Sequence, residues 1–321
     1  MNGADDGPGG MGPGTSAAPL RSLMMVPGDR AESVVDALSA GADAVACDLG
    51  DSVAASRLGA ARLAVRTVVG EHAGQHSRIF VRVAAPGSAM LDDDLDAVVV
   101  PGLTGLVLPG VTCADEVRAV SRRLGQLEAE RGMTVGSTVV MPMVDTAQGA
   151  RFAYDIASSS ARIAFMGAVT SAQGDLSRHI GFRWTPVGTE SLVLRSWVLL
   201  QARAAGVRFP VSGVWTLVDD LDGLRAFAEQ ARGLGYSGLV AIHPTHVAII
   251  NEIFTPTEQE IDQWREVITT MRAAQAQGVG ALRFHGELLD EAHVKTAVLG
   301  LELAARLDLV PASEILGPSA E

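Results

Sequence analysis

The chain has 321 residues, a formal net charge of −12 at pH 7, 48% hydrophobic residues and only 4% aromatic residues. Its Lys and Arg residues form no basic stripe, which argues against binding to nucleic acid or to an anionic membrane surface, because both need clustered cations. It also contains no uninterrupted apolar run of about 18 residues, so no membrane span is predicted.

The N-terminal segment, residues 1–19, is rich in Gly and Pro and lacks the cationic start and apolar run of a secretory signal. We predict a disordered tail here and a cytoplasmic protein. Cys47 and Cys113 adjoin apolar runs and are predicted to be buried free thiols. The single lysine, Lys295, lies in a helix-like stretch and is predicted to be solvated, which argues against Schiff-base catalysis.

Short apolar runs alternate with longer amphipathic segments from residue 20 to about residue 250. The runs show no apolar–polar alternation, which is typical of parallel strands that are covered on both faces. Strands are predicted at Ser22–Val26, Ala44–Leu49, Ile79–Val83, Gly105–Leu108, Thr138–Val144, Arg162–Met166, Val211–Trp215 and Leu239–Ile242. Helices are predicted between them at Ala31–Ala40, Ser56–Val69, Ala114–Arg131, Gln148–Ser158, Glu190–Ala205 and Asp219–Gly233.

This order of elements indicates an α/β fold, a (β/α)8 TIM barrel, over residues 20–256. A doubly wound open sheet is the alternative. Its dinucleotide-binding form lacks support, because no G-x-G-x-x-G follows a predicted strand.

Residues 257–321 follow the last predicted strand and form a predicted C-terminal helical extension. Thr257–Gln277 is predicted to be a long helix with Thr257 as its N-cap, and Gly278–Gly280 ends it. A turn and a final helix are predicted to follow. Because a barrel does not need this extension for closure, we predict a lid or an arm that contributes to the site of a neighbouring subunit.

Polar side chains follow or end several of the predicted strands, and in a TIM barrel catalysis occurs at those strand ends. They are Arg30, Asp48, Asp51, Arg82, Asp145, Asp175 and His243. Some have a structural alternative, since Asp48 and Asp51 can cap a helix and His243 can be a structural histidine. Arg82 lies between Val81 and Val83, where a charge is costly unless it is paired or used. Carboxylates and an arginine on one rim favour oxyanion binding through a hard cation such as Mg²⁺.

From about Arg21 to Leu307, the chain resembles the citrate lyase beta-subunit-like branch of the HpcH/HpaI aldolase superfamily. The resemblance rests on RSLMMVPGDR, ADAVACDLGDSVA, RIFVRVAAPGS, GLTGLVLPGV, MPMVDTAQGA, LVAIHPTHVAIINEIFTPT and HGELLDEAHV, in this order. It implies a magnesium-dependent (β/α)8 lyase that cleaves or forms a (3S)-citryl-, malyl- or citramalyl-CoA-like thioester. It also implies a homo-oligomer, most simply a trimer, with a CoA thioester or small keto acid as ligand.

Two catalytic residues follow from the resemblance. Arg82 matches the arginine that stabilises the developing enolate, and Asp290 in GELLD matches an acid/base aspartate supplied by a neighbouring subunit. Asp145 and Asp175 match the metal ligands, and Asp145 would also contact the substrate. A direct count from Gly167 places Thr170 at the second metal position instead of Asp175.

Other matched positions surround these. Arg30, Ile242 and His243 match positions that contact substrate or CoA, together with Arg82. Asp48 and Asp51 are expected to orient the site or its waters from behind the ligands.

Several positions depart from the pattern of the family. Gly50 replaces the glutamate of D-L-E-D, Ala84 replaces an asparagine, and Gly110 and Thr112 stand where lysine and glutamate are common. Asp145 is one methylene shorter than the usual glutamate, a shift of about an ångström, whereas such sites tolerate about half of that. These departures leave an alternative open, a diverged homologue that is a CoA-ester hydrolase or a non-catalytic CoA- or keto-acid-binding protein.

Overall fold

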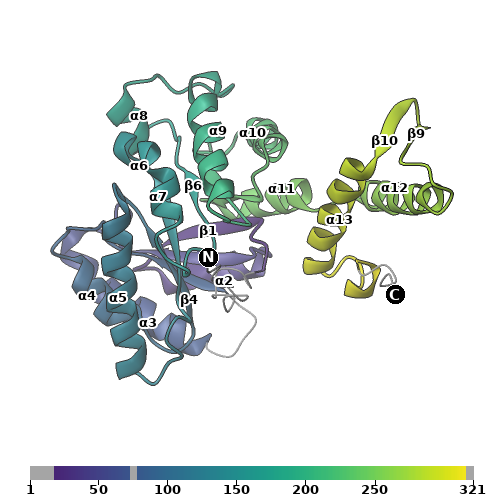
Figure 1. Cartoon of the computed structure of the whole chain (residues 1–321). Coiled ribbons are helices and arrows are strands. Elements are labelled where there is room, and N and C mark those ends of the chain that lie inside the picture. The colour runs from purple at the N-terminus through teal and green to yellow at the C-terminus, as the bar shows by residue number, and fades with distance from the viewer. Residues whose placement is uncertain (1–17, 73–77, 316–321) are drawn as a thin grey trace, which may run out of the picture. The chain divides into compact units, whose positions relative to one another are not determined.

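A computed structural model describes residues 18–72 and 78–315 of the chain (Figure 1). The tail predicted over residues 1–19 lies almost wholly outside the described residues. The chain divides into two compact units, the first ending at Ile253 and the second beginning at Phe254; the sequence predicts the corresponding boundary at 256/257. No helix in the described part of the chain is both long and apolar enough to span a membrane.

The first unit is built on eight parallel strands, hydrogen-bonded in the order β6-β5-β4-β3-β2-β1-β8-β7. The strands are β1 (Ser22–Pro27), β2 (Ala44–Asp48), β3 (Ile79–Arg82), β4 (Leu103–Leu108), β5 (Val139–Val144), β6 (Gly167–Ala168), β7 (Val211–Val214) and β8 (Gly238–Ala241). At the remaining seam, the N–H of Val211 donates to the C=O of Met166 at 3.1 Å. The predicted (β/α)8 architecture is therefore confirmed as a nearly closed barrel.

Helices surround these strands. They are α2 (Ala31–Ser39), η1 (Ala55–Arg57), α3 (Leu58–Glu71), α4 (Leu91–Val98), α5 (Ala114–Glu130), α6 (Ala147–Arg151), α7 (Ala153–Ala157), α8 (Asp175–Ile180), α9 (Thr189–Ala204), α10 (Leu221–Leu234) and α11 (Pro244–Phe254). The helix predicted over Gln148–Ser158 is broken at Phe152, whose φ of −103° and ψ of 22° depart from helical values.

The core lies within and around the strands and is aliphatic. All five residues of β2 and all six of β5 are buried, as expected for strands covered on both faces. Both cysteines are free, as predicted. Cys47 on β2 is 1% exposed, whereas Cys113, the N-cap residue of α5, is only partly buried.

The sixth strand differs from the prediction of Arg162–Met166. In this segment only Ile163 forms a β-bridge, an isolated one with Val140, and the strand itself is Gly167–Ala168. Gly167 lies so close to β7 that an added Cβ would come within 1.6 Å of the carbonyl oxygen of Val211. The seam of the barrel therefore requires a residue without a side chain, a constraint that an apolar run does not reveal.

The second unit consists of α12 (Glu258–Gln275), β9 (Ala281–Phe284), β10 (Glu287–Asp290), α13 (Glu291–Arg306) and η2 (Ala312–Glu314). Thr257 caps α12 as predicted, in a capping box with Glu260. A small core of its own includes Ile261, Met271 and Leu301. The antiparallel hairpin of β9 and β10 replaces the simple turn that the sequence predicts.

Candidate active site

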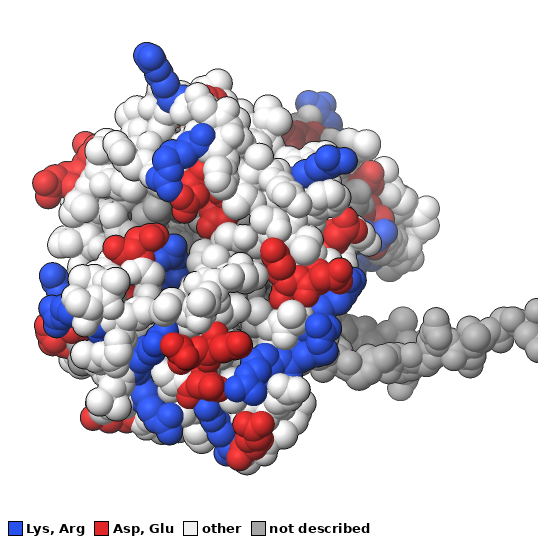
Figure 2. All heavy atoms as spheres, turned by 90° about the vertical axis from the view of Figure 1, so that its left-hand side faces the viewer, with Lys and Arg blue, Asp and Glu red and all other residues white. Residues whose placement is uncertain are grey.

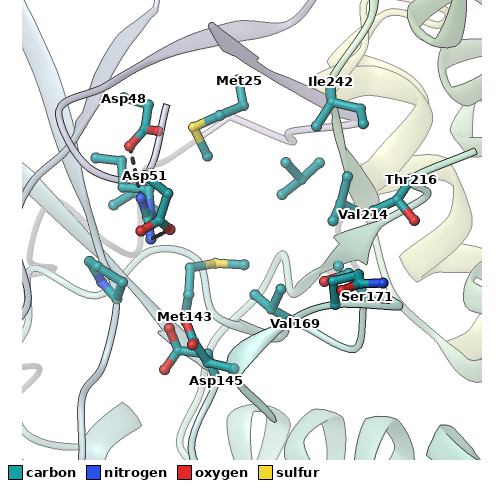
Figure 3. Close-up of a pocket in the computed structure, with 18 of the residues that line it drawn as sticks. Met25, Asp48, Asp51, Met143, Asp145, Val169, Ser171, Val214, Thr216 and Ile242 are labelled. Atoms are coloured by element: carbon teal, nitrogen blue, oxygen red, sulfur yellow. Dashed lines mark hydrogen bonds and ion pairs between the residues drawn. The ribbon is translucent and has the colours of Figure 1, made fainter. Parts of the chain in front are cut away.

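A cavity of about 500 Å³, the first cavity, lies at the carboxyl ends of the barrel strands. Figure 3 shows Asp48 and Asp51 on one side of it and Val214, Thr216 and Ile242 on the other. Its remaining lining residues are Met25, Arg82, Val107, Pro109, Met143, Asp145, Val169, Ser171, Gln173, Gly174, Asp175, Arg178, Gly213 and Val240. The lining therefore joins a charged side to an apolar wall.

Arg82 is held at the end of β3 by two carboxylates from the neighbouring strand end, those of Asp48 and Asp51. Its Nη1 donates to Asp48 Oδ1 at 2.9 Å, and its Nη2 donates to Asp51 Oδ2 at 2.8 Å. Burial alone would raise the pKa of Asp48, but the Arg82 charge and the hydrogen bonds from Ser52, Arg82 and Gly50 lower it. These two charge-assisted hydrogen bonds fix the orientation of the guanidinium.

Gly50 makes this position of Arg82 sterically possible. An added Cβ at Gly50 would lie 2.3 Å from Arg82 Nη1 and 3.1 Å from Asp48 Oδ1. The guanidinium therefore occupies the space that any side chain at position 50 would need. The observed position of Arg82 is thus compatible with Gly50 but not with a glutamate at position 50.

Asp145 follows β5 directly and is 6% exposed. Both of its oxygens accept from the backbone N–H of Gly110, each at 3.0 Å. Gly110 has a φ of +68°, a conformation that favours glycine. Burial raises the pKa of Asp145, and the Gly110 hydrogen bond and the charge of Arg82 offset this only in part. Asp145 is therefore a buried carboxylate that would gain from a cation.

Asp175 begins α8 and lines the first cavity together with Asp145. Its carboxylate forms an ion pair with Arg178, one turn later on the same helix. Thr170, the alternative ligand, is 2% exposed and is not among the residues that line the cavity. Its hydroxyl has no hydrogen-bond partner within residues 18–72 and 78–315. Of the two candidates for the second metal ligand, only Asp175 therefore shares the cavity with Asp145.

The remaining predicted site residues divide between the cavity and its surroundings. Ile242 lines the first cavity. Arg30 is exposed, His243 is half-buried, and neither lines this cavity. Asp290 belongs to the second unit, where its carboxylate caps α13 by accepting from Ala292 N–H at 3.0 Å. The hydrogen bond from His293 lowers the pKa of Asp290.

A second cavity of about 300 Å³ adjoins the same carboxylates. It shares Asp51, Arg82, Pro109, Asp145 and Asp175 with the first cavity, and its other lining residues are Gly50, Val83, Ala84, Ala85, Gly110, Thr146 and His179. Four of the five positions that depart from the family pattern, Gly50, Ala84, Gly110 and Asp145, thus line one space. The fifth, Thr112, donates from its N–H and its hydroxyl to Glu116, which supports the start of α5.

The site can be tested for its fit to Mg²⁺. No group of three or more His, Cys, Asp and Glu side chains is arranged to hold a metal ion among the described residues. Magnesium, however, commonly takes one or two carboxylates and completes its coordination with water and substrate oxygens. Asp145 forms no ion pair within the described chain and shares a cavity with Asp175. This donor set fits Mg²⁺, although Arg178 competes for Asp175.

Two features of the site were not foreseen from the sequence. Arg178 was missed, although its spacing of three residues from Asp175 in one helix is a recognisable signal for an ion pair. For Met25 and Met143, which line the first cavity, the sequence predicts only that they lie in strands, because an apolar run does not indicate side-chain direction at a strand end. On the face of the molecule in Figure 2, acidic and basic side chains are interspersed, without an extended basic area there.

Comparison with known proteins gives a consistent picture. A family model described as HpcH/HpaI aldolase/citrate lyase matches residues 21–244. The chain is 35% identical over 279 residues to a citrate lyase subunit beta-like protein of Deinococcus radiodurans, with 85% of this chain and 93% of that protein covered. It is 29% identical over 282 residues to a (3S)-malyl-CoA thioesterase of Cereibacter sphaeroides, with 88% and 93% covered.

Among solved structures, the chain is similar to CitE from Mycobacterium tuberculosis in complex with magnesium, acetoacetate and coenzyme A. The TM-score is 0.69 and the sequence identity 28%, with 90% of this chain and 99% of that chain covered. The strand-end cavity, the barrel and these matches agree, and the chain belongs to the HpcH/HpaI aldolase/citrate lyase family.

Proposed function

We propose that the chain is a Mg²⁺-dependent carbon–carbon lyase that cleaves or forms a (3S)-citryl-, malyl- or citramalyl-CoA-like thioester. The observation that carries this proposal is the convergence of Arg82, Asp145 and Asp175 on one cavity at the barrel strand ends. The family membership and the similarity to a CitE structure with magnesium, acetoacetate and coenzyme A support it.

In the cleavage direction, the bond between the carbinol carbon and the α-carbon of the acyl group breaks. Its electron pair moves onto the α-carbon and is delocalised onto the thioester oxygen as an enolate. The carbinol hydroxyl loses its proton and becomes the keto oxygen of the departing acid. Protonation of the α-carbon then completes the acyl-CoA.

Arg82 suits the stabilisation of the enolate. Its guanidinium is fixed by Asp48 and Asp51, so it needs no reorganisation when negative charge develops nearby. Asp145 and Asp175 would hold Mg²⁺, which supplies Lewis-acid polarisation of the oxygens of the acid half. Burial raises the pKa of Asp145, so a cation beside this carboxylate would favour its charged form.

Asp290 is the residue we assign to proton transfer, supplied by a neighbouring copy in a trimer. Its lowered pKa keeps it ionised, as a carboxylate that accepts the hydroxyl proton must be. Ile242 would lie against the substrate, and Arg30 and His243 are proposed to contact the CoA moiety nearer the rim.

A CoA-ester hydrolase is the second candidate, because one relative of similar identity is a (3S)-malyl-CoA thioesterase. The same carboxylates and cation would then serve to activate water against the thioester carbonyl. The products separate the two activities. A lyase yields an acyl-CoA and a keto acid, whereas a hydrolase yields free CoA and the intact hydroxy acid.

Isothermal titration with Mg²⁺ and pyruvate or oxaloacetate tests the proposed site. The wild-type chain is expected to bind the keto acid only with Mg²⁺, and Asp145→Asn is expected to abolish that binding. Asp290→Asn is the matched comparison: this variant is expected to bind the keto acid as wild type does but to lose turnover. Absence of Mg²⁺-dependent binding well above millimolar concentrations would rule out the lyase, and equal turnover in both variants and wild type would refute the residue roles.

A further inference from the structure

The end of β3 is held by a buried carboxylate that lies outside both cavities. Asp94, in α4, is fully buried, and its Oδ2 accepts from the backbone N–H of Ala84 at 2.8 Å. Ala84 lies two residues after Arg82, the last residue of β3. Asp94 itself lines neither cavity, so it contacts the site only from behind.

The segment that Asp94 holds is a wall of the second cavity. Four consecutive residues, Arg82 to Ala85, line that cavity. The N–H of Ala84 lies in the middle of this segment, at the point where the chain leaves the sheet. The carboxylate of Asp94 gives this N–H a partner where the strand has ended.

Three successive residues at this strand end are each hydrogen-bonded to a different element. The C=O of Arg82 accepts from the N–H of Leu49, directly after β2, at 2.9 Å, and the N–H of Val83 donates to β4 at 3.2 Å. The N–H of Ala84 donates to Asp94 of α4. The backbone at Arg82 is therefore placed by the strands on both sides and, two residues later, by a helix.

Arg62, in α3, fixes the Asp94 carboxylate in turn. Its Nε donates to Asp94 Oδ1 at 2.8 Å, and its two other nitrogens donate to Asp93 and to the C=O of Met90, each at 3.2 Å. The Arg62 side chain is only 15% exposed, so the pair is largely shielded from water. Because each Asp94 oxygen has its own donor and one of these bonds is charge-assisted, the carboxylate is a firm anchor for Ala84.

A neutral side chain of the same shape could not make both bonds. Asparagine at position 94 would present one oxygen and one NH₂ group, and the NH₂ group would face a donor, either the N–H of Ala84 or the guanidinium of Arg62. One bond would then be lost and a buried donor left without an acceptor. Asp94→Asn therefore loosens the anchor with almost no change in volume.

We propose that Asp94 is a positioning residue that holds the end of β3 so that the Arg82 guanidinium stays where the enolate forms. This inference rests on the proposed lyase function. Asp48 and Asp51 hold the guanidinium directly, whereas Asp94 acts through the backbone at Ala84. Loss of its charge should move Arg82 without removing any group that touches the substrate.

The test compares Asp94→Asn with wild type in the steady-state cleavage of a citramalyl- or malyl-type CoA thioester with Mg²⁺. Because a displacement of about 1 Å can cost about 100-fold in rate, we expect kcat per folded molecule to fall at least about tenfold. The charge of the enolate develops only after the substrate has bound, so KM should rise by less than about threefold.

Glu128→Gln is the matched control. Glu128 is also a fully buried carboxylate that accepts from a guanidinium and from backbone N–H groups, those of Gly136 and Thr138. These N–H groups precede β5 and lie at the opposite end of that strand from Asp145. The control should lose stability as Asp94→Asn does, but its kcat per folded molecule should equal that of wild type.

A spectroscopic readout gives the position of Arg82 without turnover. Burial acts to raise the pKa of Asp48, but the charge and hydrogen bond of Arg82 lower it. A ¹³C NMR titration should therefore show a raised Asp48 pKa in Asp94→Asn and an unchanged one in Glu128→Gln. Arg62→Lys keeps the charge but cannot bond as the guanidinium does, and it should shift both readouts in the same direction by less. It decides the question if Asp94→Asn does not fold.

Two outcomes overturn the positioning role. One is an Asp48 pKa equal to that of wild type in the Asp94 and Arg62 variants, and the other is a fall in kcat no larger than in Glu128→Gln. In both cases the wild-type chain still cleaves the thioester, so the proposed function stands. Absence of turnover by wild type overturns the proposed function, whereas the Asp48 titration tests the placement of Arg82 in either case.

Discussion

Replacement of Gly50 by alanine should displace Arg82 from the carboxylates that hold it. The new Cβ would lie 2.3 Å from Arg82 Nη1, well inside ordinary van der Waals contact, so the guanidinium must move by about an ångström. Because the clashing atom is the end of a long side chain, we expect Arg82 rather than the backbone to shift.

The magnitude follows from the two hydrogen bonds. The bond from Arg82 to Asp48 joins side chains that are 17% and 6% exposed, and a hydrogen bond between charged groups contributes about 1.5–3 kcal/mol. The Asp51 side chain is 86% exposed, so its pair contributes less than about 1 kcal/mol. Alanine also leaves the unfolded chain less conformational freedom than glycine does, which offsets about 0.4–1 kcal/mol of this loss of stability. We expect the free energy of unfolding to fall by about 1–2 kcal/mol at pH 7.

The pKa of Asp48 gives a second readout. Arg82 and Ser52 hold this pKa below its usual range against the effect of burial. A depressed carboxyl pKa contributes stability above the pKa of the unfolded chain, and that contribution is lost as the pH falls through the folded-state pKa. In Gly50→Ala the pKa of Asp48 should rise, and the stability difference from wild type should narrow at acidic pH.

The assay combines urea denaturation at several pH values with an NMR titration of ¹³C-labelled aspartate. Gly59→Ala is the matched control, because an added Cβ at Gly59 meets no atom within 4 Å. That control should be neutral or stabilising, since Gly59 lies in α3. An unchanged pKa of Asp48 in Gly50→Ala, with unchanged stability, would refute the coupling of Gly50 to Arg82.

Two further predictions concern buried groups away from the cavities. Glu128 is fully buried and accepts from Arg162 at 2.8 and 2.6 Å, so Glu128→Gln should lower the free energy of unfolding by about 3–5 kcal/mol at pH 7 in urea titrations. Hydrogen bonds from Arg162 and from backbone N–H groups lower the pKa of Glu128, although burial opposes them. The stability difference between wild type and Glu128→Gln should therefore shrink as the pH falls through that pKa. A difference that does not depend on pH would contradict the pairing. Burial raises the pKa of Cys47 to about 12, so a thiol reagent at pH 8 should modify Cys113 in the folded chain and both cysteines only after unfolding. Rapid modification of Cys47 in the folded chain would contradict its burial.

The barrel could be predicted because its signal is local. Each strand is an apolar run that ends in polar residues. The position of Arg82 or Asp145 at a strand end follows from this change from apolar to polar residues. The predicted position of the sixth strand is wrong, because the strand is fixed at Gly167 by the close approach of the Val211 backbone from another strand. A long-range contact of this kind leaves no trace in the run itself.

The hairpin of the second unit was missed for a similar reason. His285 and Gly286 both have positive φ, at 47° and 91°, as a two-residue hairpin turn requires. Because His-Gly is not one of the common dipeptides for such turns, the sequence did not indicate it. The second cavity could not be predicted either, since it arises where the small residues Gly50, Ala84 and Gly110 meet in space.

The most direct test of the central claim is product analysis with a citramalyl- or malyl-type CoA thioester and Mg²⁺. The wild-type chain should release an acyl-CoA and a keto acid in equal amounts, with none released after chelation of the metal or by Asp145→Asn. Release of free CoA with an intact hydroxy acid, or no metal-dependent reaction with either thioester, would contradict the lyase account.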